Sequence, residues 1–309
     1  MKAIRFHRFG GPEVLQLSDT EEPHAGPGQV RMAVRAAGIN RSDLMKVSTG
    51  HWKGRPIPLP SGVGVEGAGI VDELGAGVTG VALGDAIFGC GFDMLAEHAV
   101  MRPGIWALKP ALKPQGLSFE EAGSAPVVVE TSTRILDLVG LTPGETLLVS
   151  GAAGGVGLAV VQFARLRGAV VIGTASARNH DQLRLLGAIP TVYGPGLVER
   201  VRALAPQGVQ AALDIAGSGV VPDLVELVGD PSRVVSIADF KAPEHGVRLS
   251  LAPQAHPERT LAHAARLLAE GSFRVPVAAV FALAQAAEAY RRCATGHAAG
   301  KIVISIPPL

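Results

Sequence analysis

Apolar and polar positions follow two distinct patterns along this chain. Between residues 146 and 238, short apolar runs are separated by segments whose apolar residues recur every three or four positions. The first of these units predicts a strand at 146–150, a helix at 155–166 and a strand at 169–174, closing within about thirty residues as a βαβ unit does. Further helices are expected at 178–187, 197–205 and 221–229, and further strands at 191–193, 209–217 and 233–238. This alternation predicts an α/β fold with a doubly wound parallel sheet.

The first hundred residues follow a different pattern. Clusters of Gly and Pro, such as PHAGPGQ and GRPIPLPSG, separate short β-like runs, which predicts a compact and largely antiparallel β domain. Its strands are expected in KAIRF, VRMAVRAAGI, GAGIVDEL, DAIFG and AEHAVM. A helical stretch at 118–138 leads into the parallel region. After that region the pattern predicts helices at 256–271 and 281–294 and a closing strand in KIVISI.

Composition narrows the possible classes of function. A length of 309 residues favours about two domains. The 28 Lys and Arg residues nearly balance 27 acidic residues, so no global field attracts nucleic acid or an anionic membrane. Only Cys90 and Cys293 occur, which excludes a disulfide framework and a cysteine zinc cluster. Because the N-terminus lacks an apolar signal core and no run is long enough to span a membrane, we expect a soluble cytoplasmic protein.

The segment SGAAGGVGLAV, at 150–160, joins the first strand of the parallel region to the following helix. Its spacing, Ala152-x-Gly154-x-x-Gly157, is a dinucleotide fingerprint with Ala in place of the first Gly. A bare turn that opens a helix presents free N–H groups and a positive dipole to a phosphate. A glycine-rich turn can also simply cap a helix, but the βαβ context favours a nucleotide site. We assign it to Ala152, Ala153, Gly154, Gly155, Val156 and Gly157.

Six further motifs extend along nearly the whole chain: AAGINRSD (36–43), PSGVGVEGAGIV (60–71), LGAGVTGVALGD (74–85), LTPGETLLVSGAAGGVG (141–157), LRLLGA (183–188) and GKIVI (300–304). With them the chain resembles the medium-chain dehydrogenase/reductase superfamily, in its zinc-free quinone oxidoreductase branch. The resemblance implies a GroES-like β domain at 1–120, completed by 272–309, and a Rossmann-type domain at 121–271. It also implies an active site in the cleft between the domains and a homodimer formed through a Rossmann edge strand.

The chain departs from the zinc-dependent branch of that superfamily at two positions. Where that branch has a Cys and a His, this chain has Asn40 and Val65. Since catalytic zinc needs three protein ligands, we expect no metal, and we expect Glu66 to be a buried or cleft carboxylate rather than a ligand. Without a Lewis acid, reduction of a conjugated carbonyl is easier than oxidation of an unactivated alcohol.

The second strand of the parallel region indicates which cofactor is bound. An acidic residue there would hold a free ribose 2′-hydroxyl, but none occurs between Thr174 and Asn179. The hydroxyl and guanidinium groups of Ser176 and Arg178 suit a 2′-phosphate instead. The resemblance adds Tyr193 as a phosphate contact, so we predict NADPH. The alternative is that Arg178 is a surface residue at a helix start and Tyr193 a packed strand end.

The resemblance also supplies catalytic candidates. Asn40 and Asp43 follow a strand where the family places groups facing the nicotinamide, although Asn-x-Ser-Asp equally favours an Asx turn and a helix cap. Thr131 aligns with a Thr near the nicotinamide. Trp52 stands near the position of a Tyr in many relatives and is expected to shape the pocket, while His51 is either a proton donor or solvent-exposed. We also assign to the cofactor site Ala216, Ile237, Phe240 and Lys301, together with Asn40, Thr131 and Thr174.

These observations predict a zinc-independent, NADPH-dependent reductase of quinones or α,β-unsaturated carbonyls, acting by direct hydride transfer on a small-molecule substrate. One alternative is a pathway-specific enoyl reductase that acts on a biosynthetic intermediate, favoured by Trp52 and by the unusual Glu130 beside Thr131. Another is a non-catalytic NADPH-binding protein. No nucleic-acid or membrane partner is expected. The physiological substrate, the proton donor and the roles of Glu66 and Glu130 stay unassigned.

Overall fold

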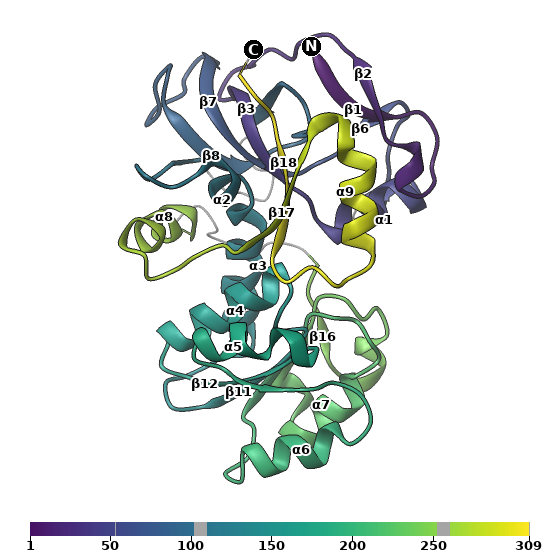
Figure 1. Ribbon diagram of the computed structural model, residues 1–309, viewed down its shortest axis with the longest axis vertical. Coiled ribbons are helices and arrows are strands. Elements are labelled where there is room, and N and C mark those ends of the chain that lie inside the picture. The colour runs from purple at the N-terminus through teal and green to yellow at the C-terminus, as the bar shows by residue number, and fades with distance from the viewer. Residues whose placement is uncertain (53, 102–109, 252–259, 309) are drawn as a thin grey trace. The chain divides into compact units, whose positions relative to one another are not determined.

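The computed structural model describes residues 1–52, 54–101, 110–251 and 260–308 (Figure 1). Contacts divide them into two compact units. Unit 1 comprises the described residues of Met1–Glu130 and Pro253–Leu309, and unit 2 comprises those of Thr131–Ala252. None of the helices among the described residues has the length and apolar character needed to cross a bilayer.

Unit 2 is built on a parallel sheet of six strands in the order β13-β12-β11-β14-β15-β16. In its central register, Thr146 lies opposite Val170 and Ser150 lies opposite Thr174. All neighbouring strands of this sheet are parallel, which confirms the doubly wound sheet predicted from the sequence. The strands are β11 (Thr146–Ser150), β12 (Val170–Thr174), β13 (Ile189–Thr191), β14 (Ala211–Asp214), β15 (Val234–Ser236) and β16 (Arg248–Leu249).

The predicted helices of unit 2 are present with small shifts at their ends. They are α4 (Gly155–Leu166), α5 (His180–Leu185), α6 (Leu197–Leu204) and α7 (Val221–Val228). As the reversal of strand order at β11 requires, α4 and α5 lie on one face of the sheet and α6 and α7 on the other (Figure 1). Covering both faces buries β11 and β14 completely, which explains their continuous apolar runs.

Unit 1 contains a sheet of seven strands in the order β10-β8-β7-β3-β18-β17, with β9 also paired to β3. A three-stranded sheet, β2-β1-β6, and a hairpin, β4-β5, complete it. Except for the parallel pair β17–β18, neighbouring strands in this unit are antiparallel, as the sequence predicted for its N-terminal part. The N-terminal strands are β1 (Lys2–Phe6), β2 (Gln16–Asp19), β3 (Val30–Gly38), β4 (His51–Trp52), β5 (Arg55–Pro56), β6 (Ser61–Gly62), β7 (Glu66–Leu74), β8 (Ala86–Cys90), β9 (His98–Met101) and β10 (Ala111–Leu112).

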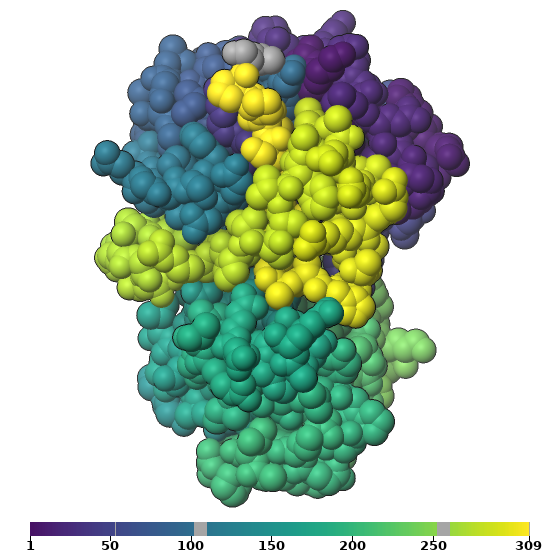
Figure 2. Space-filling model, viewed as in Figure 1, coloured from purple at the N-terminus to yellow at the C-terminus, as the bar shows by residue number. Residues whose placement is uncertain are grey.

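The C-terminal segment completes unit 1. Strand β18 (Lys301–Ser305) pairs with β3, and β17 (Val277–Ala282) pairs with β18 at the edge. Helix α9 (Ala286–Ala294) packs beside α1 (Arg41–Thr49), and Figure 2 shows these yellow C-terminal residues lying against purple N-terminal ones. The helix predicted at 281–294 therefore begins later than expected, because its first two residues pair with β18 as part of a strand.

The helix predicted at 118–138 is two helices, α2 (Phe119–Gly123) and α3 (Ala125–Leu138). Helix α2 lies close against β3, since a Cβ on Gly123 would meet the carbonyl carbon of Ala36 at 2.9 Å. Contacts therefore place α2 in unit 1, as they do α8 (Thr260–Glu270), and the division between units falls inside α3. The domain boundaries predicted from the sequence, after residues 120 and 271, stay a prediction.

Candidate functional site

The glycine-rich turn leaves β11 and opens α4. Gly151 follows β11 with φ of +83°, a left-handed conformation that favours glycine. The turn is held to β12, because the N–H of Ala152 donates to the carbonyl of Thr174 at 3.0 Å and that of Gly151 to the Thr174 hydroxyl at 3.2 Å. Gly154 then caps α4, and its carbonyl accepts from the N–H of Leu158 at 2.8 Å. Thr174, assigned to the cofactor site, thus shapes the turn.

Two glycines of the turn serve different purposes. A Cβ on Gly157 would collide with the carbonyl oxygen of Gly151 and lie 2.7 Å from Cα of Ala152, so Gly157 allows the helix to approach the strand. A Cβ on Gly154 would meet nothing closer than 3.7 Å. The bare backbone at Gly154 is therefore not required by packing within the chain, and it leaves the start of α4 open to a ligand.

The assignment of the first fingerprint position to Ala152 stays a prediction, and the residue that reverses the chain is Gly151. Ala152 is fully buried beneath the turn, whereas Gly151 adopts the positive φ that reverses the chain. Gly151, Gly154 and Gly157 follow one another at intervals of three residues. That regular spacing is the signal in the sequence that identifies Gly151.

Polar groups gather at the carboxyl ends of β12 and β13. The hydroxyls of Ser176 and Tyr193 lie 3.2 Å apart, and Tyr193 is 57% exposed. Arg178 is exposed in the short 3₁₀ helix that follows Ser176. Arg200, which the sequence reading missed, donates to the carbonyls of Val192, Gly194 and Pro195 and so holds the loop that carries Tyr193.

A buried acid ties together the loops after β14 and β15. Asp214 is fully buried and accepts from the Gly217 N–H at 3.0 Å and from the Ser236 hydroxyl at 2.8 Å. The same Ser236 oxygen accepts from the N–H groups of Ala238 and Asp239. The sequence reading missed this pair, although an acid ending an apolar strand was its signal. The pair fixes the loops that carry three predicted cofactor residues, Ala216, Ile237 and Phe240.

In unit 1, three polar side chains from distant segments meet where β3, β7 and β18 begin or end. The amide nitrogen of Asn40 donates to Glu66 Oε1 at 2.8 Å. The ammonium of Lys301 lies 2.7 Å from the same carboxylate oxygen and 2.7 Å from Asn40 Oδ1. We call Asn40, Glu66 and Lys301 the amide–ion-pair cluster. It brings together two residues that the sequence assigned to the site and one whose role it left open.

Main-chain groups complete the hydrogen bonding of this cluster. Lys301 also donates to the carbonyl of Ile39 at 3.0 Å, and Glu66 Oε2 accepts from the Val127 N–H at 2.8 Å. Glu66 is 0% exposed and Lys301 5%, so the charges are compensated within the protein rather than by water. The expectation that Glu66 is a buried carboxylate is confirmed. The assignment of Lys301 to the cofactor stays a prediction.

Asp43 forms a second buried group beside this cluster. Its Oδ2 accepts from the Asn40 N–H at 2.9 Å, which caps α1, and from the hydroxyl of Tyr290 at 2.9 Å, while Oδ1 has no hydrogen-bond partner among the described residues. Burial raises the pKa of Asp43 to about 6 and raises the pKa of Tyr290 well above its usual value. The helix cap considered from the sequence is therefore present. The catalytic role of Asp43 stays a prediction.

The remaining catalytic candidates lie elsewhere in the chain. Trp52 is half-buried in β4, which pairs with β5. His51 is exposed, with its ring 2.9 Å from the carbonyl of Thr49. Thr131 and Glu130 are both buried in α3. The roles assigned to Trp52 and Thr131 stay predictions.

The residues of unit 1 do not fit the zinc centre of an alcohol dehydrogenase. Val65 is apolar and buried, and the Lys301 ammonium already pairs with Glu66. Across the described parts of the chain, no group of three or more His, Cys, Asp and Glu residues has a geometry suited to a metal ion. The donor set therefore disagrees with a tetrahedral zinc site.

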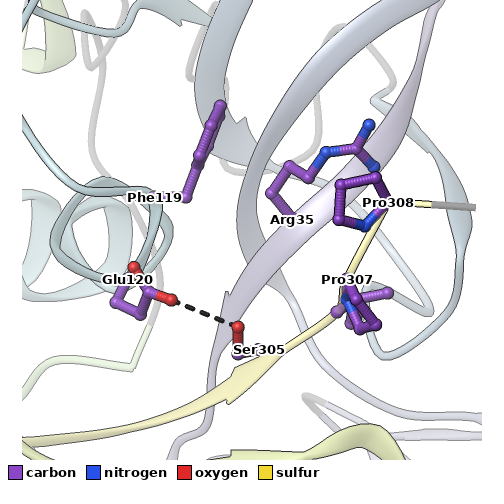
Figure 3. A pocket seen from close by; sticks show the side chains of 7 residues that line it. Arg35, Phe119, Glu120, Ser305, Pro307 and Pro308 are labelled. Atoms are coloured by element: carbon purple, nitrogen blue, oxygen red, sulfur yellow. Dashed lines mark hydrogen bonds between the residues drawn. The ribbon is translucent and has the colours of Figure 1, made fainter.

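A surface pocket in unit 1 contains none of the predicted site residues (Figure 3). Glu120 and Ser305 line one side, where the Ser305 hydroxyl donates to the carboxylate at 3.1 Å. The lining is completed by Arg35, Phe119, Ile306, Pro307 and Pro308. Glu120 and Ser305 satisfy each other on that side, and no feature of the lining selects a ligand.

Comparison with known families matches both units. The family described as "Alcohol dehydrogenase GroES-like domain" matches residues 26–116, and the one described as "Zinc-binding dehydrogenase" matches residues 186–304. The quinone oxidoreductase of Pseudomonas aeruginosa is 31% identical over 98% of this chain and 99% of its own length. The pikromycin polyketide synthase component PikAII of Streptomyces venezuelae is 35% identical over 91% of this chain, which spans only 8% of that protein.

Solved structures of quinone oxidoreductases are also similar to this chain over nearly its full length. The Escherichia coli quinone oxidoreductase complexed with NADPH superposes with a TM-score of 0.86 at 25% identity, covering 99% of this chain and 100% of that one. The quinone oxidoreductase of Coxiella burnetii superposes with a TM-score of 0.84 at 29% identity, covering 99% of both chains.

Replacing Asp43 by Asn should change how stability depends on pH. Because burial raises the folded-state pKa to about 6, above 3.8 for the unfolded chain, the stabilisation from the neutral acid is complete below about pH 4. It is lost as the pH rises from about 4 through 6, by about 3 kcal/mol in all. Asp43→Asn keeps an acceptor for Asn40 and Tyr290 but does not titrate. Urea unfolding at about pH 5 and pH 8 should therefore favour the variant increasingly at the higher pH. An identical pH dependence in both proteins would contradict this.

Proposed function

Because the chain belongs to the medium-chain dehydrogenase/reductase superfamily, in its quinone oxidoreductase-like branch, we propose that it is a zinc-independent, NADPH-dependent reductase of quinones or other α,β-unsaturated carbonyls. Similarity to the Pseudomonas quinone oxidoreductase over nearly the full length of both chains is the observation that carries this proposal. We further propose that it acts as a cytoplasmic homodimer whose two subunits meet through an edge strand of the parallel sheet in unit 2. The edge strands of that sheet are β13 and β16.

Unit 2 has groups that fit NADPH. The open backbone at Gly154 and the start of α4 suit the pyrophosphate, because free N–H groups and the helix dipole favour an anion. The Ser176 and Tyr193 hydroxyls, with Arg178 nearby in sequence, suit a 2′-phosphate, and no acid lies between Thr174 and Asn179 to bind a free ribose hydroxyl. When bound, NADPH supplies the hydride. The chain's residues bind and orient it and exclude water.

The polar side chains of unit 1 suit a carbonyl substrate whose reduction needs no metal ion. The amide–ion-pair cluster presents a neutral amide where the zinc-dependent branch has a ligand, and its cation is already bound by protein oxygens. A conjugated carbonyl needs little activation, because electron density moves to its oxygen as hydride adds to the β-carbon. The proton then comes from solvent or from a weak local donor. Quinones and enones share this chemistry.

A pathway-specific enoyl reductase is the second candidate. The polyketide synthase component is 35% identical to this chain over 91% of this chain's residues. That identity is higher than the 31% found for the quinone oxidoreductase. Trp52 also replaces the Tyr of many relatives and removes an acidic hydroxyl. Enoyl thioesters and quinones share the conjugated carbonyl, so one assay compares them.

The purified protein should oxidise NADPH when a quinone or enone is added, and EDTA should leave the rate unchanged, because no zinc is needed. Absorbance at the NADPH band with a panel of quinones, simple enones and enoyl thioesters measures this. A kcat/KM at least tenfold higher for thioesters would support the second candidate. Tightly held zinc that is required for turnover would contradict the proposal, and NADPH binding without turnover on any substrate would indicate a non-catalytic protein.

Gly154→Val should abolish NADPH binding in a folded protein. Its backbone is extended, with φ of −75° and ψ of 169°, and a Cβ would have room within the chain, so we expect the variant to fold and its side chain to obstruct the ligand. Gly157→Ala is the matched contrast, since its Cβ collides with the turn and should cost about 1–3 kcal/mol of stability. Thermal unfolding and NADPH titration of both variants measure this. Unchanged NADPH affinity in folded Gly154→Val would refute the assignment of the turn.

Arg178→Ala should weaken NADPH binding about tenfold or more and leave NADH almost unaffected. The lost contact is a charge-assisted hydrogen bond of about 1.5–3 kcal/mol, and NADH lacks the phosphate that accepts it. Titration of both cofactors into the wild type and the variant gives the ratio of affinities, which separates this contact from general damage. A wild type that prefers NADH, or equal losses for both cofactors, would show that this site is assigned incorrectly.

A further inference from the structure

The charges beside Asn40 fix the orientation of its side-chain amide. Lys301 carries only donors and the Glu66 carboxylate only acceptors. Asn40 therefore turns Oδ1 to the ammonium at 2.7 Å and Nδ2 to the carboxylate at 2.8 Å. The flipped amide would place its N–H₂ against the ammonium and its carbonyl against the carboxylate, so that both contacts would be repulsive.

Neither charged partner is free to turn away. The three hydrogens of the Lys301 ammonium match three acceptors: Ile39 O, Asn40 Oδ1 and Glu66 Oε1. Glu66 Oε2 is held by the Val127 N–H. Because both charged side chains are buried, water does not compete for these bonds. The cluster is thus a rigid support for one amide.

One polar hydrogen of that amide remains for a ligand. Asn40 is half-buried, and of its two Nδ2 hydrogens one is directed to Glu66. The second has no acceptor among the contacts made by the described residues. Since Oδ1 already accepts from the Lys301 ammonium, the polar hydrogen that Asn40 has left to offer a molecule beside it is this Nδ2–H donor.

We propose that Glu66 and Lys301 are positioning residues that hold the Asn40 amide as a hydrogen-bond donor to the carbonyl oxygen of the substrate. The identity of that oxygen rests on the proposed reductase function. A fixed donor strengthens its bond as electron density accumulates on the oxygen, and it needs no reorientation to do so. An amide free to flip would present its carbonyl for part of the time and repel that oxygen.

The orientation of Asn40 is directly measurable, because the chain contains only two asparagines, Asn40 and Asn179. Labelling with ¹⁵N-asparagine gives two side-chain amide signals in an NMR spectrum, and Asn179→Ala identifies that of Asn40. In the wild type its two hydrogens should be well separated, and the one held by Glu66 should exchange slowly with water. In the double variant Glu66→Gln/Lys301→Met, which removes both charges together, the separation should shrink and exchange should accelerate at least tenfold.

Turnover distinguishes positioning from a merely structural role. The double variant should lose about tenfold in kcat with little change in the KM for NADPH. Introduced into Asn40→Ala, the same two changes should alter kcat less than twofold, because the group through which they act is gone. If the double variant does not fold, Glu66→Asp serves, since it keeps both buried charges but withdraws the carboxylate from the Asn40 amide by one methylene.

Three results would overturn the proposal: unchanged Asn40 signals in the variant, an additive loss of kcat in the Asn40→Ala background, or a raised KM for NADPH at unchanged kcat. The last would instead support direct contact of Lys301 with the cofactor. The NMR measurement needs no substrate. If the wild type reduces no quinone or enone but the Asn40 signals respond as expected, the reductase function fails and the positioning by Glu66 and Lys301 stands.

Discussion

The ion pair between Lys301 and Glu66 joins segments that lie 235 residues apart in the chain. Lys301 is the first residue of β18 and Glu66 the first of β7, and both contact the end of β3 through Asn40. Losing one partner of such a buried pair costs about 3–5 kcal/mol, because the other charge is stranded. The C-terminal segment must therefore pack onto unit 1 before Glu66 can be buried, because that segment supplies Lys301.

The glycine-rich turn of unit 2 depends on a different kind of constraint, which is the close approach of the backbone of α4 to the turn after β11. Gly151 reverses the chain and Gly157 lets α4 approach β11, so both are needed for the fold itself. Gly154 is not needed for packing. The same short turn thus combines glycines whose loss would damage the structure with Gly154, where an added Cβ would meet nothing closer than 3.7 Å.

Much of the fold was predictable from the sequence, because apolar periodicity reports which faces are buried. The helix at 155–166 and the strand at 146–150 have the predicted bounds. The break at Ser124 and the late start of α9 were not predictable, since each depends on contact with a strand distant in sequence. Asn40 and Lys301 were predicted from the sequence as site residues. Their contact with Glu66 was not, because the three residues are far apart in the chain. The partnership of Asp214 with Ser236 was equally hidden.

In the proposed zinc-independent reductase, an internal ion pair in place of a metal would limit how unit 1 activates a substrate. A zinc ion with an open position polarises an oxygen directly, whereas every hydrogen of the Lys301 ammonium is bound by protein oxygens. Any polarisation that the cluster provides must pass through the neutral amide of Asn40, which stabilises negative charge far less than a metal ion. Such a site suits substrates whose own conjugation spreads the negative charge that develops on the carbonyl oxygen. On this reasoning, the replacement of zinc ligands and the proposed preference for quinones and enones follow from one physical cause.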